Sequence, residues 1–100
     1  MPWVTLPNGK RVLFALRMAE FRELWQSGAV QALQNLEKGG DMAAAYPVLA
    51  KAAKAWDLTD LEGQPLDPTL EASYDELEPS AFLWLLKAVR AYISGEETKN

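Results

Sequence analysis

The sequence predicts a small, mainly α-helical domain of four to five helices that carries an N-terminal β-hairpin. Three observations lead to this prediction. The chain has 100 residues, which is the size of one ordinary domain. Apolar residues recur with helical spacing along most of the chain. Near the N-terminus, Asn8-Gly9 separates two short runs of β-formers. We expect residues 1–95 to form a single domain and residues 96–100 to form a flexible tail.

The hairpin is expected over about residues 2–15. Trp3–Leu6 and Arg11–Phe14 are rich in residues that favour strands, and the Asn-Gly pair between them supplies the positive φ angles of a tight turn. An isolated two-stranded hairpin is only marginally stable. We therefore expect this hairpin to lie on helices or to pair with the edge of another chain.

The first helix is expected to begin near Met18. Phe21, Leu24 and Trp25 follow one another at helical spacing, which predicts a helix whose apolar face packs in the core. The same period resumes over residues 29–38. This segment is either a second helix or a continuation of the first past the intervening glycine.

An alanine-rich segment comes next and is expected to be helical as far as Trp56. Asp41 is a natural N-cap for this segment. Pro47 lies within it and either kinks the helix or marks the first turn of a new one. Leu49 and Ala53 share a stripe with the tryptophan, so this face is expected to be buried.

The last third of the chain begins with a polar, turn-rich segment, residues 57–66. A short helix is expected over residues 67–77, where an Asp-Pro pair opens it and Pro79 stops it. Ser80 is expected to cap the last helix, which runs over about residues 81–94. A glycine at position 95 then ends this helix.

The last helix is apolar over more than half of its circumference. Phe82, Leu86 and Val89 form its main stripe, and Trp84 lies well away from that stripe. Such a helix is either the central helix of the bundle or a helix with one face against a partner. The sequence leaves both interpretations open.

The residue types argue against an enzyme. The chain has no histidine and no cysteine, so the usual nucleophile–base pairs and most transition-metal sites are excluded. The carboxylates at residues 20–23 and 75–78 are expected on solvated helix faces, where acid–base catalysis is not supported. The acidic segment 57–63 lacks the ligand spacing of a calcium loop. We expect no catalytic residue, no metal and no cofactor.

Charge and hydropathy narrow the class of partner. The net charge of −4 and the pI near 4.7 argue against binding to nucleic acid. The longest apolar stretch, Ala81–Leu86, is far shorter than the roughly 20 residues that span a bilayer. Residues 1–7 do not read as a signal peptide, and the absence of cysteine suits a cytoplasmic location. A protein partner is expected, rather than a membrane or a small-molecule substrate.

Residues 56–66 read Trp-Asp-Leu-Thr-Asp-Leu-Glu-Gly-Gln-Pro-Leu and precede a short helix and a final helix. This arrangement resembles the tail assembly chaperones of long-tailed bacteriophages, and the opening hairpin is similar to their N-terminal strands. The resemblance implies a protein that binds the long, helical, hydrophobic tape measure protein. It would keep this client soluble in the host cytoplasm until tail tube subunits polymerise around it. It also implies a homo-oligomer, with the hairpin edge as one contact.

The residues expected to contact the partner lie on the last helix and on the hairpin: Trp84, Lys87, Tyr92, Val4 and Leu6. Two other functions remain open. One is a small phage regulator that binds a host enzyme through the same helical surface. The other is a structural component of the virion at the head–tail junction or in the tail.

Overall fold

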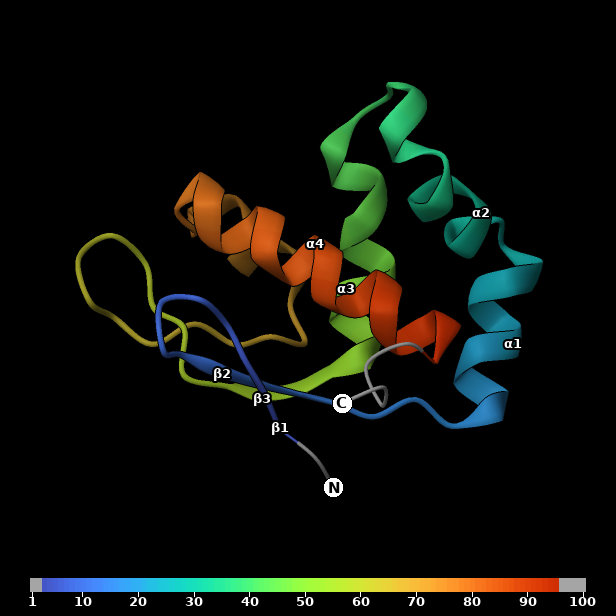
Figure 1. Cartoon of the computed structure of the whole chain (residues 1–100). Coiled ribbons are helices and arrows are strands. Elements are labelled where there is room, and N and C mark those ends of the chain that lie inside the picture. The colour runs from blue at the N-terminus through green and yellow to red at the C-terminus, as the bar shows by residue number, and fades with distance from the viewer. Residues whose placement is uncertain (1–2, 96–100) are drawn as a thin grey trace.

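A three-stranded antiparallel sheet lies along one side of the molecule, and four α-helices lie on the other (Figure 1). The computed structural model describes residues 3–95, with the backbone only at residue 37. The tail expected at residues 96–100 is outside this range. Helices make up just over half of the described residues. The predicted helical domain with an N-terminal hairpin is therefore confirmed in outline, but the sheet is larger than predicted.

The predicted hairpin is present. Strands β1 (Trp3–Thr5) and β2 (Arg11–Phe14) pair antiparallel, with Val4 opposite Val12. At the turn, Gly9 has a φ of +84°, which is a conformation that glycine adopts without steric cost. The neighbouring Asn8 side chain accepts a hydrogen bond of 3.0 Å from the backbone N–H of Lys10.

The third strand corrects a prediction. The chain from Ala53 to Trp56 is strand β3, which pairs antiparallel with β2, and not the end of a helix. Alanine favours helices, yet the open hydrogen-bonding edge of β2 overrides that weak local preference. Pairing within the chain thus stabilises the hairpin. Trp56 is fixed further by a 2.7 Å hydrogen bond from its Nε1 to the carbonyl of Leu66.

The first helical region consists of two α-helices. Helix α1 spans Met18–Gln26 and helix α2 spans Ala29–Gln34. Gly28 separates them with a φ of +85°. A short 3-10 helix, Leu36–Lys38, follows. The sequence left two interpretations open, and the one with two separate helices is correct.

Asp41 caps a helix as predicted, because its Oδ1 accepts a 3.0 Å hydrogen bond from the backbone N–H of Ala43. The capped turn is a 3-10 helix, Met42–Ala45, and helix α3 (Tyr46–Ala52) continues from it. Pro47 lies in the first turn of α3. It therefore marks the start of a new helix and does not kink a longer one.

The short helix expected over residues 67–77 is a 3-10 helix that spans only Glu71–Glu76. Asp67 does not cap it. The Oδ1 atom of Asp67 accepts hydrogen bonds from the backbone N–H and the hydroxyl of Thr69, which closes a local turn. Tyr74 is buried, and its hydroxyl donates a 2.7 Å hydrogen bond to the carbonyl of Pro68.

The last helix, α4, spans Pro79–Ser94 and so begins earlier than predicted. Pro79 occupies its first turn, where a missing N–H costs nothing, and Ser80 lies inside the helix instead of capping it. Gly95 ends the helix with a φ of +81°, as predicted. None of the helices in residues 3–95 is long and apolar enough to cross a membrane.

The core lies between the inner face of the sheet and the helices. Helix α4 contributes one buried face to this core, and Leu83 on its other side remains 48% exposed. The helix therefore combines a core face with a solvent face. The largest fully buried side chains come from β2, α2, α3 and α4: Val12, Val30, Leu33, Val48, Leu49, Leu85 and Val89.

Candidate protein-binding surface

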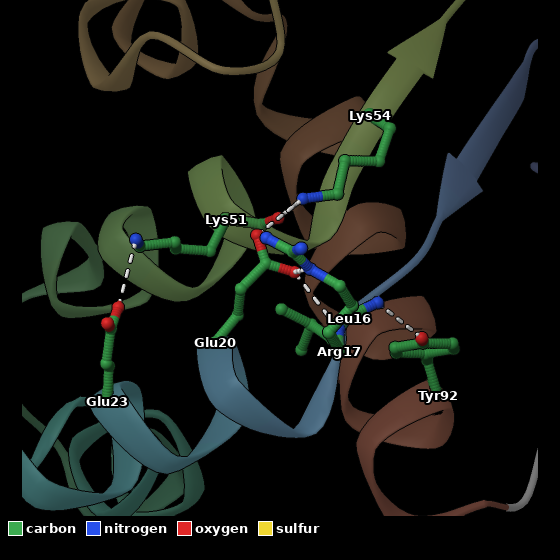
Figure 2. Close-up of polar contacts among 7 residues, drawn as sticks. All are labelled: Leu16, Arg17, Glu20, Glu23, Lys51, Lys54 and Tyr92. Atoms are coloured by element: carbon green, nitrogen blue, oxygen red, sulfur yellow. Dashed lines mark hydrogen bonds and ion pairs between the residues drawn. The ribbon is translucent and has the colours of Figure 1, made fainter.

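The three residues expected to bind a partner through α4 have different environments. Trp84 is partly buried against the core, and Lys87 is exposed. The ring of Tyr92 lies 5.6 Å from that of Phe14, and its hydroxyl accepts a 2.8 Å hydrogen bond from the backbone N–H of Leu16 (Figure 2). Tyr92 therefore fixes the segment between β2 and α1 to α4. We remove it from the expected contact residues.

The hairpin residues need a similar correction. Val4 pairs with Val12 on the inner face of the sheet and is partly buried, while Leu6 is only 4% exposed. Side chains alternate between the two faces of a strand, so Trp3 and Thr5 face solvent instead. Leu6 packs in the core and is not accessible to a partner in this conformation.

The exposed apolar surface of α1 was missed by the sequence analysis. Met18 is 74% exposed and Trp25 is 50% exposed, and partly buried Phe21 lies on the same helix face. The rings of Phe21 and Trp25 are 6.2 Å apart. We call Met18, Phe21 and Trp25 the α1 stripe. Trp25 was expected in the core, but Leu24 occupies the core position at this end of the helix.

Helical spacing puts the carboxylates of α1 on a different side from the stripe. They pair with lysines of α3 and β3 (Figure 2). Glu20 is 3.0 Å from the Nζ of Lys54, and Glu23 is 3.3 Å from the Nζ of Lys51. The backbone N–H of Arg17 also donates to the Glu20 carboxylate. This hydrogen bond and the lysine partner lower the pKa of Glu20 to about 2. Both carboxylates of α1 are thus matched by positive charge.

Arg22 borders the α1 stripe, whereas Arg17 is paired with Glu20. Arg22 is four residues after Met18 and three before Trp25, so it borders both on the helix surface, and it is exposed. Arg17, at the N-cap, is 83% exposed, and its guanidinium is 3.6 Å from Glu20. The border of the stripe is therefore positively charged.

A strongly acidic segment lies at the end of the molecule opposite α1 (Figure 1, yellow to light orange). Residues 57–78 contain eight carboxylates and no lysine or arginine, so the other residues, with 10 basic and 6 acidic side chains, carry +4. Asp57 pairs with Arg11 at 3.0 Å, which lowers its pKa. The eight acidic residues are Asp57, Asp60, Glu62, Asp67, Glu71, Asp75, Glu76 and Glu78.

Lys87 lies at a surface pocket of about 390 Å³ between α2 and the C-terminal half of α4. Leu33, Gln34, Arg90 and Ile93 also line it. The Nη2 atom of Arg90 donates a 3.1 Å hydrogen bond to the carbonyl of Leu33, which joins the two helices. Of the five residues expected to contact a partner, Lys87 is the one that lines this pocket.

No protein family, curated protein or solved structure matches this chain. Within residues 3–95, no group of three or more acidic side chains is placed to hold a metal ion. Within residues 3–95, the α1 stripe brings two exposed apolar side chains, Met18 and Trp25, together on one helix face.

Proposed function

We propose that this protein is a tail assembly chaperone that binds a helical, apolar segment of the tape measure protein and keeps it soluble. The observation that carries the proposal is the α1 stripe, in which Met18 and Trp25 are 74% and 50% exposed. The resemblance of residues 56–66 to phage tail assembly chaperones supplies the identity of the client. The stripe supplies a surface suited to such a client.

The dimensions of the stripe suit a helical client. Met18 and Trp25 are seven residues apart, or about 10 Å along the helix axis at 1.5 Å per residue. This spacing matches the distance between anchors at i and i+7 on an amphipathic helix. Tryptophan is the residue type most often found at binding hot spots, because its large rigid ring buries much area at little entropic cost. We therefore place the client helix along α1.

Co-expression with the tape measure protein tests the proposal. The wild-type chain should raise the soluble fraction of that client, and the double variant Met18→Ser/Trp25→Ser should lose most of this effect. Leu61→Ser is the matched control, because Leu61 is 77% exposed but lies in the acidic segment. An unchanged soluble fraction in the presence of the wild-type chain would contradict the proposal.

Two further outcomes would favour the other functions. Abundant chain in purified virions would identify a structural component, since a chaperone leaves before the particle is complete. A host enzyme that binds the wild-type chain, but not the Met18→Ser/Trp25→Ser variant, would identify a regulator that uses the same surface.

A further inference from the structure

We infer that the α1 stripe selects an amphipathic helix whose apolar face is flanked by aspartate or glutamate. The inference rests on the proposed function, because it concerns the same surface, and it adds the charge of the segment that binds there.

The local charges beside the stripe are positive. Arg22 is exposed and borders Met18 and Trp25 directly. The acidic residues of α1 do not offset this arginine, since Glu20 is paired with Lys54 and Arg17, and Glu23 is paired with Lys51. A helix packed on the stripe therefore places its flanking side chains beside the Arg22 guanidinium. Acidic flanking residues are attracted there and basic ones are repelled.

The net negative charge of the chain does not reverse this preference. Its source is the acidic segment 57–78, which lies at the far end of a molecule that is 36 Å long. At physiological ionic strength, interactions between exposed charges are screened over about 8 Å. A segment bound at α1 therefore responds mainly to Arg22. The carboxylates of residues 57–78 repel an acidic partner helix from the opposite end of the molecule. This repulsion favours binding of that helix at α1.

The charges around the other exposed apolar residues differ from those around the α1 stripe. Leu61 and Leu70 are 77% and 55% exposed, but both lie within the acidic segment. An acidic amphipathic helix that reached these leucines would meet uncompensated carboxylates. Trp3 is also exposed and has Arg11 stacked on its ring at 4.8 Å, but this arginine is paired with Asp57.

Two synthetic helical peptides test the inference. Both carry leucine at i, i+3 and i+7, and the flanking positions are all glutamate in one and all lysine in the other. Fluorescence anisotropy of the labelled peptides measures affinity for the full chain. At physiological ionic strength the glutamate peptide should bind several-fold more tightly, since each exposed charge pair contributes modestly to the binding free energy, and the preference should shrink as the salt concentration is raised toward about 1 M. Arg22→Glu should abolish or reverse this preference.

Lys10→Glu is the matched control, because it makes the same change in net charge in the hairpin turn. It should leave the glutamate preference within about twofold of that of the wild type, since surface charges beyond a Debye length are largely screened. Circular dichroism checks that each variant is folded. Equal or tighter binding of the lysine peptide, or a preference that survives Arg22→Glu, would overturn the inference.

The same measurements distinguish failure of the inference from failure of the proposed function. If the lysine peptide binds more tightly and Met18→Ser/Trp25→Ser abolishes that binding, the stripe is a client surface and only its charge selectivity is wrong. If neither peptide binds the wild-type chain, both the stripe as a helix-binding surface and its charge selectivity are rejected.

Discussion

The Nζ atom of Lys54 lies 3.0 Å from a carboxylate oxygen of Glu20, and this contact joins the first turn of α1 to strand β3. A second contact, between Lys51 and Glu23, joins the same helix to α3. Both carboxylates of α1 thus point toward α3 and β3 (Figure 2). Met18 and Trp25 of the same helix are exposed.

Glu20 should make stability depend on pH in acid. Its folded-state pKa is lowered from 4.5 to about 2, so its stabilising effect is complete above about pH 4.5 and is lost as pH falls toward 2. Glu20→Gln should therefore be less stable than the wild type at neutral pH, with the difference vanishing near pH 2. Urea unfolding at several pH values measures this. Glu62→Gln, on a loop, is the control, and an equal loss in both variants would contradict the assignment.

The Tyr92 hydroxyl should contribute to stability even though it is only partly buried. Tyr92→Phe keeps the ring against Phe14 but removes the acceptor of the Leu16 N–H hydrogen bond. The expected loss is about 1 kcal/mol in the free energy of unfolding, the usual net value of one such bond. Denaturant titration measures it. Unchanged stability would indicate that water replaces the hydroxyl without cost.

Two leucines of α4 that are two residues apart should respond differently to truncation. Leu85 is fully buried and Leu83 is 48% exposed. Leu85→Ala should cost about 2–5 kcal/mol, because it removes buried methyl groups and leaves a cavity. Leu83→Ala should change stability by less than about 0.5 kcal/mol. Thermal or denaturant unfolding of both variants checks which face of α4 packs in the core, and similar losses would contradict the assignment.

Ala55→Thr should distinguish a strand from a helix at residues 53–56. Threonine is favoured over alanine in strands and disfavoured in helices, by up to about 1 kcal/mol in each case. Ala55 lies opposite Leu13 in β3 and is partly buried. The substitution should therefore raise the free energy of unfolding by a few tenths of a kcal/mol. A clear decrease would support the helix that the sequence predicts.

Local signals in the sequence predicted several elements correctly. The Asn8-Gly9 turn, the Asp41 cap and the end of α4 at Gly95 each depend on chemistry within a few residues. Strand β3 depends instead on a partner about forty residues away, and its alanines carry the opposite local preference. No pattern within residues 53–56 therefore indicates the strand.

The exposure of the predicted apolar faces depends on distant segments in the same way. Helical spacing showed that Phe21, Leu24 and Trp25 share an apolar face, but it does not show how much of that face a neighbour covers. In the structure, Leu24 is covered and Trp25 is half exposed. Tyr92 was misplaced because its partner, Leu16, lies far away in the sequence. Burial depends on contacts between distant segments, and a single sequence does not reveal them.

The pairing of β3 with β2 closes a loop in the chain. Residues 15–52, which include α1, α2 and α3, run between two strands that are hydrogen-bonded to each other. The three helices are therefore held at both ends, and the conformational entropy of closing this long loop must be overcome before β3 can dock. Formation of the β2–β3 pair is thus expected late in folding. A nascent chain that ends before Ala53 would already carry α1 but would lack strand β3 and the lysine that pairs with Glu20.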